Sequence, residues 1–160
     1  HTARRENQGA TKQTGPFRKP QEIACEACRL ERLSVCGEED PSVRWTGAFA
    51  SCGGRGATQS STIVYEIEPS GRLGWHTDAT EETQYILSGK GELRMESGVY
   101  ALDPGSVFVI STDMRHDLAN VGQETLRAVA FFAAAMFTQT FDDLMLPSRT
   151  HILGSPNRAG

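Results

Sequence analysis

Four potential metal ligands lie in two short blocks in the middle of the chain: His76, Asp78, Glu82 and His116. Imidazole nitrogens and carboxylate oxygens are the donors that divalent transition metals take in proteins. The 160 residues contain four histidines, and the other two lie near the ends of the chain. Imidazole chemistry in the body of the protein therefore depends on this pair.

The first block places its donors on one face of a predicted strand. Alternate side chains of a strand point the same way, so His76 and Asp78 can share one cation. Glu82 has the same parity and begins an apolar segment that stops at Ser-Gly-Lys-Gly, which is typical of a hairpin turn. His116 belongs to a later strand, so the fold has to bring it to the first block.

The first block resembles the first sequence motif of the cupin family, H-x-H-x(3,4)-E-x(6)-G. Its spacing is matched by His76, Asp78, Glu82 and Gly89. Asp78 stands where the motif has its second histidine.

The second block resembles the second cupin motif, G-x(5)-P-x-G-x(2)-H-x(3)-N. Its spacing is matched by Gly105, Ser111, Asp113, His116 and Asn120. Ser111 replaces the proline of the motif and Asp113 replaces its glycine. We interpret Asp113 and Asn120 as turn residues that make local backbone hydrogen bonds.

The resemblance implies an all-β fold, a single antiparallel barrel of the jelly-roll type, and a divalent metal held by His76, Glu82 and His116. Asp78 is either a further ligand or a residue that orients an imidazole or a bound water. Two histidines with a carboxylate form the facial triad of non-haem iron oxygenases, which favours Fe(II), with Mn, Ni, Cu or Zn as alternatives. Gln84 has the parity of Glu82 and is, with Asp78, a candidate catalytic residue that orients substrate. A plain packing role for Gln84 stays open.

Two classes of function remain open at this point. The first is a metal-dependent enzyme that acts on a small organic substrate inside the barrel, either an Fe(II) dioxygenase, which we favour, or a non-oxidative isomerase, lyase or cyclase. The second is a cupin that binds a small molecule without turnover. We expect a small apolar lumen for either class, lined by Ile63, Ile86, Val107, Val109 and Phe132.

The rest of the pattern is that of short strands at intervals of about ten residues, as in an antiparallel sandwich or barrel. The sequence predicts strands at 43–49, 62–68, 92–95, 99–102, 107–110, 115–119 and 126–133. Tyr85 faces away from Glu82 and Gln84, and we expect it to pack in the core.

We divide the chain into four parts. Residues 1–20 are polar and are expected to form a flexible arm. Residues 21–58 are expected to pack on the barrel, with a short amphipathic helix between residues 20 and 40. The barrel spans 59–137, and 138–160 is expected to cover its outside or a dimer partner.

The chain has four cysteines: Cys25, Cys28, Cys36 and Cys52. We expect reduced, partly buried thiols, as is usual in cytosolic proteins. A structural zinc site and a disulfide are the alternatives, although zinc sites usually combine two close pairs.

The charge balance bears on partners and location. A formal net charge of −4 argues against a nucleic-acid partner, which requires a basic face.

No apolar run is long enough to cross a bilayer, and the first residues lack the apolar region of a secretory signal. We expect a cytoplasmic protein, and the resemblance to cupins implies a homodimer that packs through segments at 20–50 or 138–153.

Overall fold

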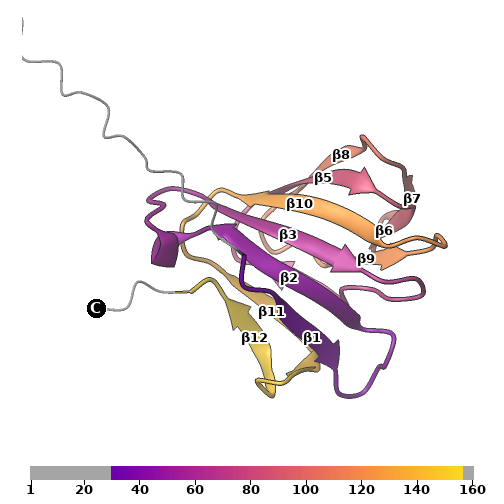
Figure 1. Ribbon diagram of the computed structural model, residues 1–160, viewed down its shortest axis with the longest axis horizontal. Coiled ribbons are helices and arrows are strands. Elements are labelled where there is room, and N and C mark those ends of the chain that lie inside the picture. The colour runs from indigo at the N-terminus through magenta and orange to yellow at the C-terminus, as the bar shows by residue number, and fades with distance from the viewer. Residues whose placement is uncertain (1–29, 157–160) are drawn as a thin grey trace, which may run out of the picture.

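The computed structural model describes residues 30–156, whose regular secondary structure is β-strand apart from one short 3-10 turn (Figure 1). The strands, with one short 3-10 turn, are β1 (Leu33–Gly37), β2 (Arg44–Ser51), η1 (Gly53–Arg55), β3 (Ser61–Ile67), β4 (His76–Asp78), β5 (Glu82–Ser88), β6 (Gly91–Met95), β7 (Gly98–Leu102), β8 (Val107–Ile110), β9 (His116–Asn120), β10 (Leu126–Phe132), β11 (Thr138–Leu146) and β12 (Thr150–Gly154).

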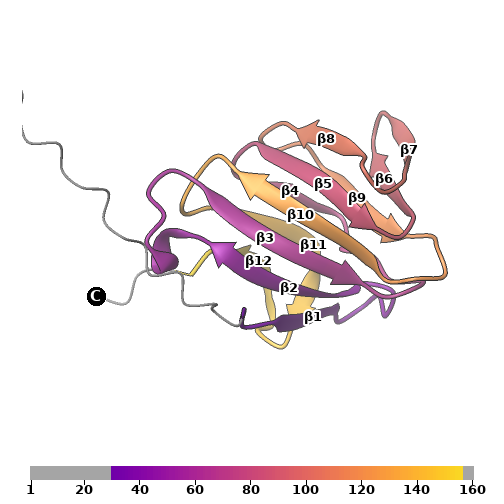
Figure 2. The ribbon, with the colours of Figure 1, turned by 45° about the horizontal axis from the view of Figure 1, so that its top comes forward.

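All the strands belong to one antiparallel sheet with the order β7-β6-β9-β4-β11-β1-β2-β3-β10-β5-β8, and β12 pairs with β11. The sheet curls over on itself, so that β4 and β11 lie behind β3 and β10 (Figure 2). Strands β11 and β1 join the two halves at one side. The expected all-β, barrel-like architecture is confirmed.

Strand β3 shows why these segments are strands with one inner face. Ile63, Tyr65 and Ile67 are buried and alternate with half-buried residues, as the period of two predicts. The same core contains Phe132 of β10 and Phe141 of β11, so both halves of the curled sheet contribute to it.

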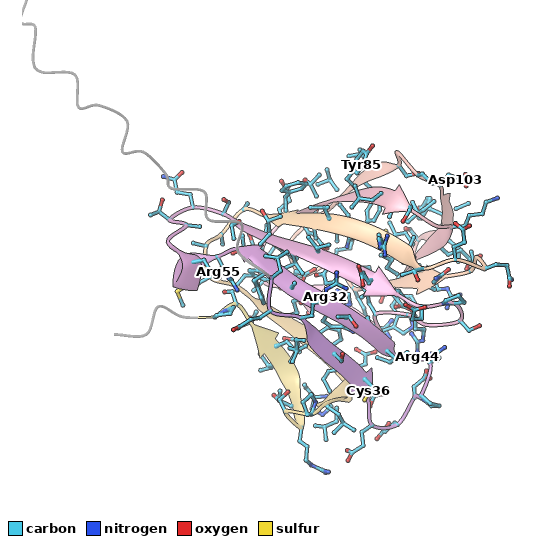
Figure 3. All side chains as sticks on the ribbon, in the orientation of Figure 1. Arg32, Cys36, Arg44, Arg55, Tyr85 and Asp103 are labelled. Atoms are coloured by element: carbon cyan, nitrogen blue, oxygen red, sulfur yellow. The ribbon has the colours of Figure 1, made fainter. Side chains whose placement is uncertain are left out.

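Strand β8 has the opposite orientation to the one expected. Val107 and Val109 are 62% and 59% exposed, so they do not line the interior. The register with β5 explains the difference. Glu82 and Gln84 point inward, and the β8 residues paired with them therefore point inward too, which turns both valines outward. Tyr85 lies on the same outer face and is 40% exposed (Figure 3), so the expectation that it packs in the core is wrong.

Residues 33–37 form strand β1, not part of a helix. Val35 is buried while its neighbours Ser34 and Cys36 are exposed, which is a strand pattern. β1 pairs with β2 on one side and β11 on the other, so its backbone groups are satisfied by the sheet. The first part of the expected helix and the arm at 1–20 lie outside the described residues.

Strand β11 is also part of the sheet, which differs from the expected covering role of residues 138–160. Its first half pairs with β4 on one side and with β12 on the other, and its end pairs with β1. The strand thereby connects β4, at the start of the first motif, to the N-terminal strands.

The second motif forms turns despite its departures from the family pattern. Asp113 has φ 61°, a left-handed conformation that glycine adopts freely and aspartate tolerates. The Asn120 side chain donates to the carbonyl oxygens of Ile67, at 2.7 Å, and Glu124, at 2.8 Å, and it accepts from the Gly122 amide at 2.9 Å. The predicted turn roles of these two residues agree with this geometry.

Two further expectations concern cysteines and membranes. Within the described range, Cys36 is an exposed free thiol and Cys52 a buried one, so neither forms a disulfide with the other. Cys25 and Cys28 lie outside the described residues. Between residues 30 and 156, no helix has the length and apolar character needed to span a bilayer.

Candidate metal centre

The two histidines lie side by side because β4 and β9 are neighbours in the sheet. His76 begins β4, His116 begins β9, and they are opposite one another in the antiparallel register. Their ring centroids are 4.2 Å apart with an interplanar angle of 52°. The ring of Phe141 stacks on His76 from β11, with centroids 4.7 Å apart. Strand pairing therefore brings together two residues from different motifs, as the sequence predicts.

Each imidazole is oriented by a main-chain carbonyl two residues earlier. Nδ1 of His76 lies 2.7 Å from the carbonyl oxygen of Gly74, and Nδ1 of His116 lies 2.8 Å from that of Met114. A carbonyl only accepts, so in the neutral rings Nδ1 carries the proton and Nε2 has a free lone pair. Both Nε2 atoms are buried and have no hydrogen-bond partner.

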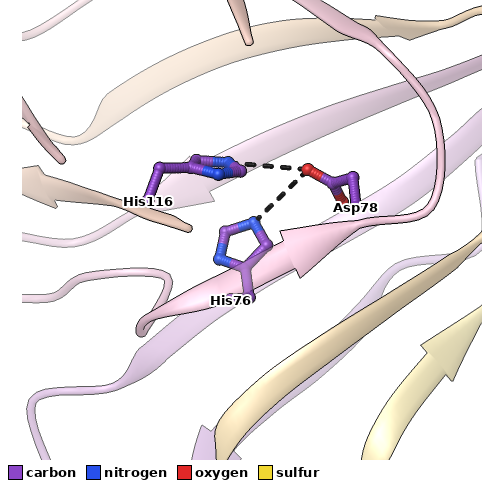
Figure 4. Close-up of side chains that lie close together, drawn as sticks. All are labelled: His76, Asp78 and His116. Atoms are coloured by element: carbon purple, nitrogen blue, oxygen red, sulfur yellow. Dashed lines mark ion pairs between the residues drawn. The ribbon is translucent and has the colours of Figure 1, made fainter. Parts of the chain in front are cut away.

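Asp78 completes a close group with the two histidines (Figure 4). Its Oδ2 lies 3.9 Å from Nε2 of His76 and 3.5 Å from Nε2 of His116. One donor atom from each of the three residues lies within 4.8 Å of the others, and all three residues are buried. Both carboxylate oxygens of Asp78 lack a hydrogen-bond partner.

Glu82 and Gln84 enter the same space from β5. Oε2 of Glu82 is 3.4 Å from Nε2 of His116, and Oε1 accepts a hydrogen bond of 2.8 Å from the Gln84 amide. Both side chains are fully buried, so the lumen-facing orientation predicted for them is correct. The geometry ranks the carboxylates differently from the sequence, because Asp78 belongs to the close group while Glu82 approaches it through His116.

Burial dominates the electrostatics of the cluster. Burial and the neighbouring His116 lower the pKa of His76 from 6.5 to about 3, so this ring is neutral. Burial and the charge of Glu82 raise the pKa of Asp78 from 3.8 to about 8. Burial also acts to lower the pKa of His116, but Glu82 and Asp78 outweigh it and hold that pKa above its usual value. Without a cation, the cluster lowers the stability of the fold. It buries the carboxyl groups of Asp78 and Glu82, and the two histidines balance their charge only in part.

These residues fit a divalent cation. Both Nε2 atoms, both oxygens of Asp78 and Oε2 of Glu82 are buried without hydrogen-bond partners, and an unpaired buried polar atom is expensive. A cation would satisfy them together, and the carbonyl-bound Nδ1 atoms are the outer contacts that orient metal-ligating imidazoles.

An ion pair between Asp117 and Arg72 helps to hold the backbone that orients His76. Asp117 points away from the interior but is fully buried, and it accepts hydrogen bonds from the Gly74 amide, at 2.8 Å, and from Arg72, at 2.7 Å. The Gly74 carbonyl is the acceptor for His76. Contacts thus run from Arg72 through Asp117 and Gly74 to an imidazole. Sequence reasoning missed this support, and the only signal for it was a charged residue directly after His116.

An apolar cavity of about 110 Å³ lies inside the described sheet, and none of the cluster residues lines it. It is lined mainly by apolar residues of β1, β2, β3 and β12, among them Trp45 and Ile63, and by Phe137, which precedes β11. Gln139 also lines it and is paired with Asp78 across β11 and β4. This cavity differs from the lumen that the sequence predicted. Of the five residues expected to line that lumen, only Ile63 lines the cavity.

Comparisons with known proteins agree with this fold. Residues 63–132 match the family model of the cupin domain. A candidate sugar phosphate isomerase from Acidithiobacillus ferrooxidans is 26% identical with a TM-score of 0.55, over 74% of this chain and 78% of that one. The polyketide cyclase RemF from Streptomyces resistomycificus is 20% identical with a TM-score of 0.51, over 55% of this chain and 63% of its own.

Oxalate decarboxylases are also similar in structure. The Lactobacillus farciminis enzyme is 21% identical with a TM-score of 0.57, over 61% of this chain. The match covers 31% of that enzyme, so the chain spans less than a third of its length. No curated protein sequence is significantly similar to the chain. The match of residues 63–132 to the cupin model, the curled antiparallel sheet and the solved structures that share it show that this chain has the cupin fold.

Proposed function

We propose that this protein is a metal-dependent enzyme that acts on a small organic molecule inside the curled sheet. One observation carries the proposal: two imidazole Nε2 atoms and the Asp78 carboxylate lie together, buried and without partners. Buried polar atoms are almost always satisfied, so a buried cluster of unpaired nitrogen and oxygen lone pairs supports the binding of a cation here. An apolar cavity reaches Gln139, the strand partner of Asp78, and a cavity of this kind could hold the apolar part of a substrate.

We propose His76, Asp78 and His116 as the ligands, with Glu82 as a fourth ligand or a base beside them. Two histidines and one carboxylate are the donor set of non-haem Fe(II) oxygenases, so Fe(II) and a dioxygenase reaction are the first to test. A bound Fe(II) would supply open positions for dioxygen and substrate. Gln84 would hold Glu82 through its amide, and the apolar walls would exclude water from the reacting atoms.

A second function, metal-assisted isomerisation or cyclisation, is favoured by the carboxylate pair. The charge of Glu82 helps to raise the pKa of Asp78 to about 8, which is the situation of paired acids that exchange protons near neutral pH. The likeness to a candidate sugar phosphate isomerase and to a polyketide cyclase supports the same class. A cupin that binds its ligand without turnover is the remaining alternative.

The free thiols Cys36 and Cys52 support a reducing compartment, and we propose a cytoplasmic location on that ground. We also propose a homodimer, in keeping with the large apolar side chains exposed on strands β1 and β12, Leu33 and Ile152.

The test is metal analysis of freshly purified protein, followed by oxygen uptake with small carbonyl and hydroxyl substrates. We expect about one transition metal per chain, lost in His76→Ala and His116→Ala and kept in His151→Ala, whose histidine lies in β12 outside the cluster. Turnover without oxygen uptake would support the isomerase class. Full metal content in both cluster variants would refute the site.

A further inference from the structure

Four adjacent strands, β3, β10, β5 and β8, carry a row of apolar side chains on their outer face. The antiparallel registers connect one residue of each strand to the next, in the order Val64, Val129, Tyr85 and Val107. Exposure increases along this row: the first two residues are half-buried, Tyr85 is 40% exposed and Val107 is 62% exposed. Figure 2 shows the four strands side by side.

Further exposed apolar side chains widen the exposed end of this row into a patch. Phe131 and Val109 lie in the next row, where both are in register with Thr83 of β5, and Leu87 lies two residues from Tyr85 on the same strand. We call Tyr85, Leu87, Val107, Val109 and Phe131 the outer patch. Apolar side chains exposed singly are ordinary, but a contiguous group from three adjacent strands marks an interaction surface.

The outer patch also includes a free edge of the sheet. Strand β8 is the last strand at its end of the sheet, and within the described residues it pairs with β5 alone. The main-chain groups on its other side are therefore open to pairing with another chain, and proteins often cover such an edge with a helix or a loop. A cover over β8 would protect both its edge and its exposed valines.

The described chain begins on this same face, at the buried end of the row. Leu30 and Arg32 line one small surface pocket together with Val64. Arg32 also forms an ion pair with Glu66, two residues along β3 from Val64 (Figure 3). Ala48, the register partner of Val64 in β2, lines the same pocket and is only 6% exposed. The segment at Leu30 thus covers the first part of the outer face, and the chain before it starts beside Val64.

The segment just before Leu30 has a sequence that suits the rest of the row. Ile23, Ala27 and Leu30 recur at the spacing i, i+4 and i+7, so in a helix they share one face, while Cys25 falls on the opposite side. This is the part of the expected amphipathic helix that precedes strand β1. A helix over residues 20–29 would therefore have one apolar face to bury.

The length of such a helix matches the length of the row. Neighbouring strands lie about 4.8 Å apart, so the three spacings from Val64 to Val107 cover about 14 Å. A helix rises 1.5 Å per residue, so residues 20–29 span about 15 Å. With Leu30 fixed beside Val64, a helix that follows the row places Ile23 over Tyr85.

We propose that residues 20–29 form a helix that lies across β10, β5 and β8 of their own chain and covers the outer patch. Ile23 and Ala27 face the patch, and the start of the helix shields the free edge of β8. The inference is independent of the proposed metal chemistry, because the residues of β5 that enter the cluster, Glu82 and Gln84, point to the opposite face of the sheet.

The test is hydrogen–deuterium exchange of the full chain, followed by mass spectrometry. Amides at 20–29 should exchange at least about 10-fold more slowly than in a peptide of the same sequence. Val107→Asp places a charge in the outer patch and should speed their exchange about 10-fold, the effect of losing one buried valine contact. The matched control is Val99→Asp, since Val99 is also 62% exposed but lies on β7, at the other end of the sheet. In the reciprocal variant, Ile23→Asp, amides at 107–110 should exchange faster.

Three results would overturn this inference. The first is exchange at 20–29 in the wild type as fast as in the free peptide. The second is an equal effect of Val99→Asp and Val107→Asp. The third is protection that disappears on dilution together with a loss of mass in light scattering, because a second copy would then be the cover. If Val107→Asp lacks the cooperative melting of the wild type, Val109→Asp provides the same test on the same strand. Each of these results leaves the proposed metal site intact.

Discussion

Replacing Asp78 with asparagine should make the metal-free protein more stable, although it removes a proposed ligand. The pKa of Asp78 is about 8 in the folded protein and 3.8 as its ordinary value. A carboxyl group with a raised folded pKa contributes stability that is fully present below pH 3.8 and is lost as the pH rises to 8. Each pH unit in this window costs about 1.4 kcal/mol, so at pH 7 the cost reaches about 4 kcal/mol.

Asparagine does not ionise, so Asp78→Asn should escape this cost. The metal-free variant should exceed the wild type by up to about 4 kcal/mol at pH 7, or on the order of 10 °C in melting temperature for a domain of this size. The advantage should shrink as the pH falls toward 4. Metal should narrow this difference, because a ligand at a hundred times its Kd adds about 2.7 kcal/mol to the wild type alone, and it should reverse the order only above about a thousand times Kd, where the gain passes about 4.1 kcal/mol.

The assay is urea unfolding of chelator-treated protein at several pH values between 4 and 8.5. Asp103→Asn is the matched control, since Asp103 is exposed in the turn between β7 and β8 (Figure 3). This control should show no pH-dependent difference from the wild type. The reasoning is refuted if Asp78→Asn is less stable than the wild type at pH 7, or if their difference is the same at pH 4 and pH 8.

Three other predictions follow from the site and its support. Metal binding at pH 7 should release about one proton, because Asp78 with a pKa of about 8 has to ionise, and calorimetry in two buffers of different ionisation enthalpy would measure it; no release would contradict the raised pKa. Asp117→Asn should lower the free energy of unfolding by about 1.5–3 kcal/mol, since Arg72 loses a charged hydrogen-bond partner but keeps its pairing with Asp40, and should weaken metal binding about 10-fold, as chemical unfolding and metal titration can determine. Light scattering should give a dimer mass at micromolar concentration, and a monomer would rule out the proposed assembly.

Much of the fold follows from local patterns. Alternation and turn residues predicted most strands between residues 62 and 133, because these segments pair with neighbours through short turns. The donors were also recognisable, since spacing along a strand decides which side chains share a face. His76 and Asp78 could therefore be placed together from one strand, whereas Glu82 lies on β5, which does not pair with β4.

The remainder depends on contacts between distant parts of the chain. Val107 and Val109 were assigned to the wrong face because the parity of β8 is set by its register with β5. Strand β1 was taken for part of a helix because its strand pattern becomes evident only when β2 and β11 lie beside it. Spacing also does not rank Asp78 against Glu82, whose nearest oxygens lie 3.5 Å and 3.4 Å from the same Nε2 of His116.

Strand β4 depends for most of its pairing on β11, a strand that is synthesised much later. It holds two of the proposed ligands in three residues, with a single pairing to β9 and three to β11. β11 is also connected to the N-terminal part, where the Glu39 amide bonds to Asp143 across a sequence separation of 104 residues. A nascent chain with both motifs outside the ribosome still lacks the strand that fixes β4. Metal can therefore be captured in its final geometry only after residues 138–146 have left the exit tunnel.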